Sequence, residues 1–115
     1  MHELYIAESI IRSVKGALPE TVAPEQVTAV HLDVGALDAV IPDTLSFLFD
    51  AIKAEQGLSR ATLVTTTIVV ECHCRQCGEQ FPVEFPLFLC PVCHSGDVKV
   101  VKGRGINITR IIADV

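Results

Sequence analysis

Residues 72–96 read CHCRQCGEQFPVEFPLFLCPVCHSG, and this stretch decides how the rest of the chain is organised. It contains two C-x-x-C pairs separated by twelve residues. Each pair can form a tight turn that presents two thiolates to one ion, so two facing pairs form a closed tetrahedral site of four sulfurs. The gap is shorter than is usual for this pattern, which predicts a short ribbon. The predicted ligands are Cys74, Cys77, Cys90 and Cys93.

A site of four sulfurs is typical of structural zinc, although iron in a rubredoxin-like site has the same ligand geometry. A closed site leaves no position for water, so we do not expect it to be catalytic. Cys72 could compete for the metal, but the symmetry of the two pairs favours a free thiol at the end of a strand. For His73 and His94, exposed turn residues are the favoured interpretation, and ligands of a second metal are the alternative.

The segments on either side of the cysteines are rich in β-branched residues. Residues 61–71 are predicted to form one long strand, and residues 97–101 and 105–115 two more. The last of these is apolar and needs a sheet to join, which the small cysteine module does not provide. We therefore expect it to pair back with the first part of the chain, so that the cysteine module is an insertion.

The first part of the chain alternates helix and strand. Apolar residues at a three-and-four spacing predict a helix over 4–18, and alternation predicts a strand over 27–35. A proline near its start and a glycine at its end delimit a second helix over 41–57. Glu8 and Arg12 lie one turn apart on the first helix and are expected to form an exposed ion pair.

Together these elements predict an α+β fold, in which a small two-helix, antiparallel-sheet domain carries an inserted zinc ribbon on two strands. The predicted domains are residues 1–70 plus 104–115, and residues 71–103 for the ribbon module.

The composition excludes some partners. Nine Lys and Arg against fourteen Asp and Glu give a net charge of −5, and no basic run is present, which argues against nucleic acid as the main partner. We see no charged leader with an apolar segment and no apolar run of membrane-spanning length, so we expect a soluble cytoplasmic protein. All five cysteines fall between Cys72 and Cys93, which in a reducing compartment indicates a metal site before disulfides.

The chain begins Met-His-Glu, with almost no lead-in to the first predicted helix. The amine of Met1, and the deprotonated amide and the imidazole of His2, can bind one metal through fused chelate rings. Three nitrogens in a plane favour nickel(II) or copper(II) over zinc. Alone this is a weak signal, because an amino-terminal histidine is usually solvated. Glu3 either favours the helix dipole or offsets the charge of a bound cation.

Three segments resemble the hydrogenase nickel-insertion accessory proteins, the HypA/HybF family: residues 1–10, residues 34–52, and the two cysteine pairs with the apolar strand after them. The resemblance covers essentially the whole chain. It implies nickel binding at Met1, His2 and Glu3 and structural zinc on the four paired cysteines. It also implies two partners, a nickel-handling GTPase and the hydrogenase large subunit. The Cys-His dipeptide before the first pair departs from the family pattern and leaves the first zinc ligand open.

We therefore predict a nickel metallochaperone, and not an enzyme, with zinc as structural cofactor and nickel as cargo. It is expected to bind one nickel(II) weakly enough to release it and to help deliver it to an apo-hydrogenase. The alternative is a zinc-ribbon adaptor that binds protein or nucleic acid, with Met1 and His2 inert. Nickel binding by native protein, compared with protein carrying an amino-terminal extension, distinguishes the two.

Overall fold

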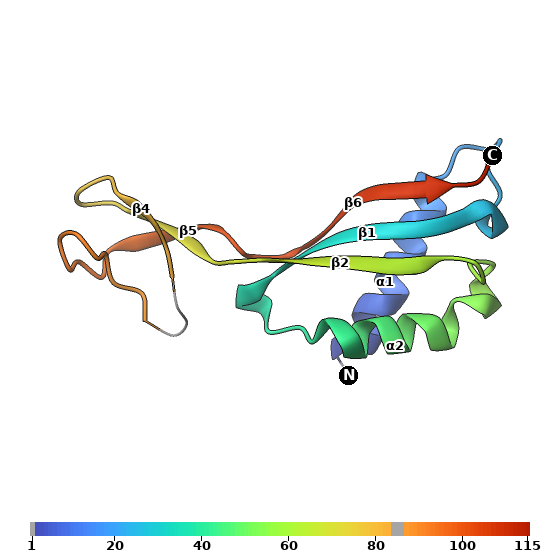
Figure 1. Cartoon of the computed structure of the whole chain (residues 1–115), viewed down its shortest axis with the longest axis horizontal. Helices are drawn as coiled ribbons and strands as arrows, with labels where there is room; N and C mark the ends of the chain where they lie inside the picture. Colours follow the sequence, from blue (N-terminus) through green and yellow to red (C-terminus); the bar gives the residue numbers. More distant parts are fainter. Residues whose placement is uncertain (1, 84–86) are drawn as a thin grey trace. The chain divides into compact units, whose positions relative to one another are not determined.

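The computed structural model describes residues 2–83 and 87–115, with the backbone alone at residue 2 (Figure 1). None of the helices in these ranges is long and apolar enough to cross a membrane. The helices and strands follow one another as α1 (His2–Ala17), β1 (Val27–Gly35), α2 (Pro42–Ile52), β2 (Thr62–Ile68), β3 (Glu71–Cys74), β4 (Gln80–Pro82), β5 (Val98–Lys102) and β6 (Ile106–Ala113).

Contacts divide the chain into two compact units. The first unit comprises Met1–Asp33, Val40–Thr66 and Asn107–Val115. The second unit comprises Val34–Ala39 and Thr67–Ile106. The second unit therefore contains the cysteine-rich stretch together with a short segment that begins with the last two residues of β1.

The larger sheet has the strand order β2-β1-β6. Strand β6 runs antiparallel to β1, because the Thr28 hydroxyl donates to the carbonyl of Ile112 at 3.3 Å and the Thr109 hydroxyl to that of His31 at 3.3 Å. Strands β1 and β2 are joined through α2 and run in the same direction (Figure 1). The predicted α+β fold and the return of the last strand to the first part of the chain are confirmed, and the sheet is mixed.

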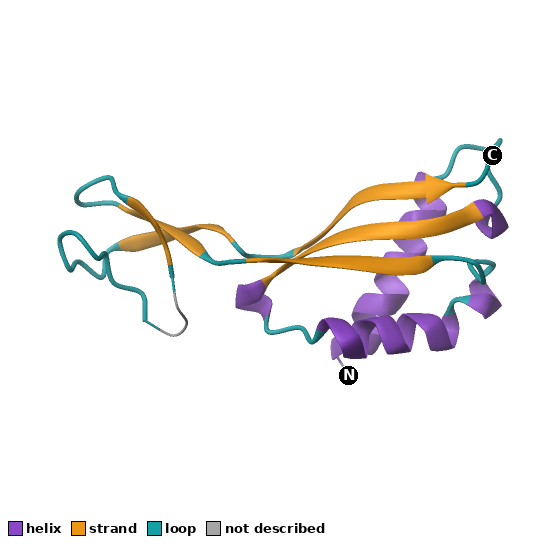
Figure 2. Ribbon diagram, viewed as in Figure 1, coloured by secondary structure: helices purple, strands orange, loops and turns teal. Residues whose placement is uncertain are grey.

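Helices α1 and α2 pack against each other on one side of this sheet (Figure 2). The apolar spacing predicted a buried stripe on each helix, and the alternation on β1 predicted one buried face. Both are confirmed, although Leu4 and Leu18 of the first predicted stripe, and Leu48 and Ile52 of the second, are only half-buried. The buried side chains of these elements are Ala7, Ile10, Ile11 and Val14 on α1, Val27, Val30, Leu32 and Val34 on β1, and Leu45 and Phe49 on α2.

The expected ion pair between Glu8 and Arg12 does not form. Arg12 donates to the hydroxyl of Ser9 at 3.1 Å, and its guanidinium carbon lies 6.0 Å from the centroid of the Tyr5 ring. A guanidinium over an aromatic face gains electrostatic attraction, whereas an exposed ion pair gains little over two hydrated ions. Within the described residues Glu8 therefore has no ion-pair partner.

The second unit carries its own sheet, of order β4-β3-β5, with antiparallel pairing throughout. Cys72 on β3 lies opposite Phe81 on β4 and Val100 on β5. Strand β4 was not predicted, and the long strand predicted over 61–71 is divided into β2 and β3. The core of this unit consists of Val70, Cys72, Cys74, Phe81 and Cys90.

Three glycines allow three segments of the second unit, around residues 35, 70 and 104, to approach one another closely. Gly35 donates to the carbonyl of Gly105 at 2.9 Å, and Leu37 donates to that of Gly103 at 2.9 Å. A Cβ on Gly103 would lie 2.6 Å from the Cα of Val70, and Gly103 has φ +92°. A side chain at Gly103 is therefore excluded by both space and backbone conformation.

Candidate metal centres

The four paired cysteines converge as predicted. Their Sγ atoms all lie within 4.8 Å of one another, with 3.5 Å between Cys74 and Cys93 and 3.5 Å between Cys77 and Cys90. An ion with metal–sulfur bonds of about 2.3 Å has tetrahedral ligands about 3.8 Å apart. Among the described residues, no other group of three or more His, Cys, Asp or Glu donors is close enough to share an ion. The spacing of the sulfurs therefore fits one tetrahedral ion, and we call this group the cysteine cage.

The two turns of the cysteine cage use the same backbone hydrogen bonds. In the first turn, Cys74 N–H donates to the carbonyl of Glu79 at 2.8 Å, and Gly78 N–H to that of Cys74 at 2.9 Å. In the second turn, Cys90 N–H donates to the carbonyl of Ser95 at 3.0 Å, and His94 N–H to that of Cys90 at 2.9 Å. The residue after each second cysteine has a left-handed backbone, φ +83° at Gly78 and +60° at His94. The local C-x-x-C sequence thus builds two equivalent halves.

Hydrogen bonds make the thiols of the first pair unequal. The backbone N–H of Cys77, 3.5 Å from the Sγ of Cys74, is the largest cause that lowers the pKa of Cys74 to about 7. Although the backbone N–H of Glu79 lowers the pKa of Cys77, the neighbouring Cys90 thiol and desolvation raise it to about 12. Because these thiols lie too close together to ionise independently, metal binding must displace the protons that the group still holds.

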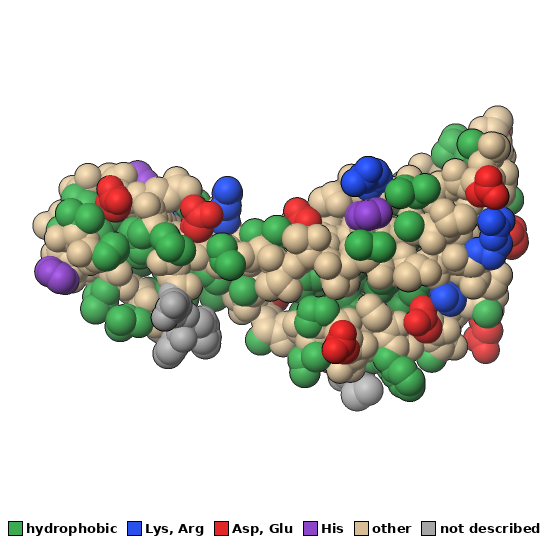
Figure 3. Space-filling model, viewed as in Figure 1, with side chains coloured by type: hydrophobic (Ala, Val, Ile, Leu, Met, Phe, Trp, Pro, Cys, Tyr) green, Lys and Arg blue, Asp and Glu red, His purple; other side chains and the backbone are tan. Residues whose placement is uncertain are grey.

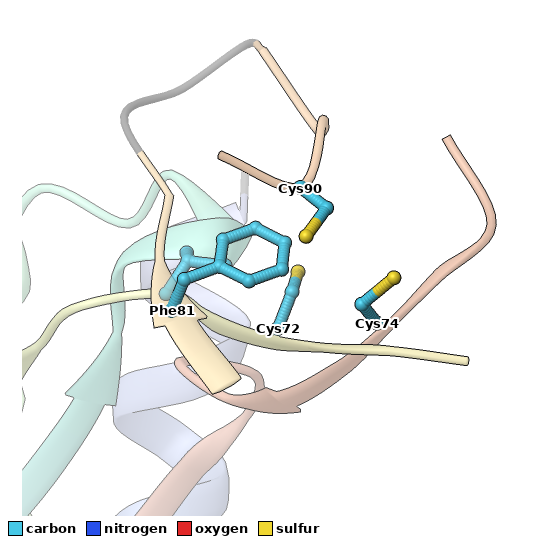
Figure 4. Close-up of a cluster of buried hydrophobic side chains, with 5 residues drawn as sticks. Cys72, Cys74, Phe81 and Cys90 are labelled. Atoms are coloured by element: carbon cyan, nitrogen blue, oxygen red, sulfur yellow. The ribbon is translucent and has the colours of Figure 1, made fainter. Parts of the chain in front are cut away.

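Cys72 belongs to the hydrophobic core and not to the cage. Its side chain is fully buried beside Phe81 (Figure 4). Burial raises the pKa of its thiol, as expected for a cysteine in apolar surroundings. The free thiol favoured by the sequence therefore acts as a small apolar side chain in this core.

Among the described residues, the two histidines that flank the cage join no group of donors close enough to share an ion. His73 lies on β3, opposite Gln80 and Lys99, on the face away from the core. His94 is exposed at the end of the second turn. The sequence left two interpretations for these histidines, exposed turn residues or ligands of a second metal. The structure favours the first, in which they are surface residues.

The predicted nickel ligands lie at the start of α1. Met1 lies outside the described residues, as does the side chain of His2, whose backbone begins the helix. Glu3 is half-buried, and its carboxylate accepts a hydrogen bond of 3.5 Å from the N–H of Ile41. Ile41 is the N-cap residue of α2, and its apolar side chain makes no capping hydrogen bond. A carboxylate is favoured there because the amino ends of helices carry partial positive charge.

This contact brings the ends of two helices together and was not predicted. Glu3 and Ile41 are separated by 38 positions, so no local pattern reveals it. The first-turn position of Glu3 in α1 did predict a carboxylate that favours a helix dipole. The structure adds that the same carboxylate also serves the beginning of α2.

Comparison with known proteins places this architecture. The sequence model of the family described as "Hydrogenase/urease nickel incorporation, metallochaperone, hypA" matches residues 1–113. The hydrogenase maturation factors HypA of Desulfosudis oleivorans and Desulfatibacillum aliphaticivorans are each 35% identical, over 96% and 99% of this chain and 96% and 88% of their own lengths.

The solution structure of the Ni metallochaperone HypA from Helicobacter pylori has the same fold. It superposes with a TM-score of 0.70 at 19% identity, and the alignment covers 96% of each chain. Together with the match over residues 1–113, these comparisons show that the chain belongs to the HypA family of hydrogenase/urease nickel-incorporation metallochaperones.

Proposed function

We propose that this chain carries nickel(II) to an apo-hydrogenase and binds the ion at its own amino terminus. The observation that carries this proposal is the family match over residues 1–113, which includes the initial Met-His-Glu. The amine of Met1 and the amide and imidazole nitrogens of His2 are the proposed donors. Nickel is the cargo, and the fourth corner of a planar site stays open for transfer.

The beginning of α1 suits this role. The first four N–H groups of an α-helix have no partner within the helix, so the amide of His2 is free to lose its proton and bind metal. The helix behind it holds the donors on a rigid element. The Glu3 carboxylate, tied to the N–H of Ile41, supplies negative charge beside the donors, and we propose it as the third residue of the nickel site.

Zinc is the proposed ion of the cysteine cage, with Cys74, Cys77, Cys90 and Cys93 as ligands. The sulfur separations described above support this assignment, and four soft thiolates suit zinc. With no open coordination position, the ion stabilises the ribbon and supplies no reactive site. We accordingly propose a carrier without catalytic activity of its own.

We propose the same two functional domains that the sequence analysis predicts. Residues 1–70 plus 104–115 form the nickel-binding domain, and residues 71–103 the zinc-ribbon module. The proposed partners are a nickel-handling GTPase and the hydrogenase large subunit, and the proposed compartment is the cytoplasm, where cysteines remain reduced.

Nickel transfer to a hydrogenase large subunit tests the proposal. Untagged, zinc-loaded protein carrying ⁶³Ni is mixed with apo large subunit, with the GTPase and GTP present, and nickel on the large subunit is counted after separation. We expect transfer above the level given by the same concentration of free nickel. Transfer equal to that from free nickel would exclude a carrier role.

A further inference from the structure

Strand β6 is an outer strand of the larger sheet and has a groove beside it. In the order β2-β1-β6, it pairs with β1 on one side only. The groove lies between β6 and the last turns of α1, and its volume is about 390 Å³, at the small end of the range of ligand-binding pockets. Its lining consists of Ser13 and Ala17 on α1 and Ile108, Thr109, Arg110 and Ile111 on β6. Neither proposed metal site contains any of these residues.

The outer edge of β6 offers backbone hydrogen bonds. Alternate residues of a strand direct their N–H and C=O groups to the same side, so about half of these groups on β6 face away from β1. Such a row of donors and acceptors is a template for another extended chain. Strand β6 has eight residues, Ile106–Ala113, which is long enough for a new strand to pair with it. The edge therefore favours a partner segment in extended conformation.

The lining of the groove favours particular side chains in such a segment. Ile108 and Ile111 are half-buried and Ala17 is exposed, so part of the lining is apolar surface that solvent still reaches. Arg110 is the one charged residue of the lining. Within the described residues, its guanidinium has no hydrogen-bond or ion-pair partner. The groove thus combines apolar surface with one positive charge that nothing in its lining balances.

The unit as a whole has the opposite charge. The first unit contains nine Asp and Glu against five Lys and Arg, which disfavours a strongly acidic partner segment. Charges more than about 8 Å away are largely screened at physiological ionic strength, so Arg110 dominates within the groove. Figure 3 shows basic and apolar side chains along β6 on the visible face, and acidic side chains toward the ends of this unit and over α2. A segment with a single carboxylate at Arg110 fits both observations.

We propose that the β6 edge and its groove bind an extended segment of a partner protein, which adds to the sheet as a further strand and directs a carboxylate to Arg110. Successive side chains of a strand point to opposite faces, so residues two apart enter the groove together. Ile108 and Arg110 are two apart on β6. The segment is therefore expected to present an apolar side chain and, two positions away, an Asp or Glu. This inference names a docking surface and does not depend on nickel binding.

A second copy of this chain fits the edge less well. Arg110 lies near the middle of β6, so antiparallel pairing of β6 with β6 of another copy brings the two Arg110 side chains close together. Like charges on neighbouring strands destabilise such a pair. The expected occupant is therefore a different protein.

The experiment titrates full-length, zinc-loaded protein with the blocked peptide acetyl-Thr-Val-Thr-Glu-Thr-Val-Thr-amide and follows amide chemical shifts by NMR. One control peptide replaces Glu by Gln. A second is N-methylated at two adjacent central residues, which removes a backbone donor from either edge of the peptide. We expect the Glu peptide to shift the amide signals of β6 and of residues 13–17. The Gln peptide should bind about two- to fivefold more weakly, and the N-methylated peptide about tenfold more weakly.

Three variants of the protein separate the charge from the groove. Arg110→Gln should bind the Glu and Gln peptides equally, because it lacks the selecting cation. Arg104→Gln removes an exposed cation that lies outside the groove and should keep the preference for Glu. Ala17→Gln fills the groove without adding charge and should weaken both peptides by the same factor. The amide spectrum of each variant without peptide shows whether the fold is retained.

Several results would overturn the proposal. Unchanged β6 signals with the Glu peptide, or equal binding of the N-methylated peptide, would exclude strand addition. Equal binding of the Glu and Gln peptides by the native protein would exclude selection of a carboxylate. Tighter binding of the Glu peptide by Arg110→Gln would show that this charge protects the edge from pairing. Shifts of the β6 signals with protein concentration alone would identify a second copy of the chain as the occupant.

Discussion

The cysteine cage and the amino terminus of α1 offer metal donors in contrasting ways. The cage takes its donors from four side chains, each fixed by a turn with two backbone hydrogen bonds. The proposed nickel donors instead belong to Met1 and to His2, the first residue of α1, where the backbone amides have no helical partner. Four cysteine ligands close a tetrahedral site, whereas the proposed amino-terminal site leaves a coordination position open.

Under the proposed function, this difference explains how one small chain holds one metal and passes on another. A closed set of ligands on a rigid frame retains its ion, because every donor must move before the ion leaves. A site built from a chain end and one side chain loses its ion by small motions of a few atoms. The following predictions test each side of this contrast.

The largest effect is expected from removing a cage ligand. Cys93→Ala should lose zinc on dialysis and unfold the second unit, because binding of structural zinc contributes about 10–16 kcal/mol at pH 7 in small zinc domains. Cys72→Ala is the matched control, since Cys72 is buried and lies outside the group of four converging sulfurs. It should keep one zinc per chain and lose only about 1–2 kcal/mol of stability. A full zinc content in Cys93→Ala would refute the four-cysteine assignment.

A large effect is also expected where the cage is anchored. Gly103→Ala places a Cβ against the backbone of Val70 in a left-handed conformation, so we expect a loss of about 2–4 kcal/mol in the free energy of unfolding. Gly16→Ala is the control, because no atom lies within 4 Å of its Cβ position in α1. It should stabilise the protein by about 0.5–1 kcal/mol. Urea unfolding of zinc-loaded protein measures the free energy of unfolding of both variants. A Gly103→Ala variant as stable as the native protein would show that position 103 tolerates a side chain.

Some of the features behind these predictions could be predicted from the sequence, and others could not. The cage was predictable because each C-x-x-C pair is local and sets its own turn. Helices α1 and α2 and strand β1 were predictable from the spacing of their apolar residues. The division of 61–71 into β2 and β3 was not, because it occurs where Gly103 crosses Val70, two residues far apart in the sequence. Strand β4 was missed because it has only three residues and includes a proline.

Contacts of the charged residues were the least predictable part. Arg12 was expected to pair with Glu8 and instead contacts Tyr5 and Ser9, because several partners lie within one helical turn. The contact of Glu3 with Ile41 depends on how α1 and α2 pack. The spacing of apolar residues predicts which face of a helix is buried. It does not predict which ends of two helices lie next to each other.

A smaller effect on stability is expected from substitutions at His94 and Gly78, and its sign should differ between the two turns of the cage. His94 and Gly78 occupy equivalent left-handed positions, where glycine carries no steric cost. We expect His94→Gly to stabilise the zinc-loaded protein by about 0.5–1 kcal/mol, and Gly78→Ala to destabilise it by about 1–2 kcal/mol. Thermal unfolding with zinc content held at one per chain measures both. A loss of stability in His94→Gly would show that the imidazole has a role beyond its backbone position.

Nickel titration of untagged protein tests the amino-terminal site most directly, with native protein, His2→Ala and protein carrying one extra residue before Met1. We expect specific nickel binding by the native protein alone, with zinc content and fold unchanged in all three. Because the α-amino group has a pKa of about 7.7–8.0 and must lose its proton, affinity should rise about tenfold per pH unit below that range, and more steeply if the His2 amide also ionises. Equal affinity in the three proteins, or no dependence on pH, would contradict a nickel site at the amino terminus.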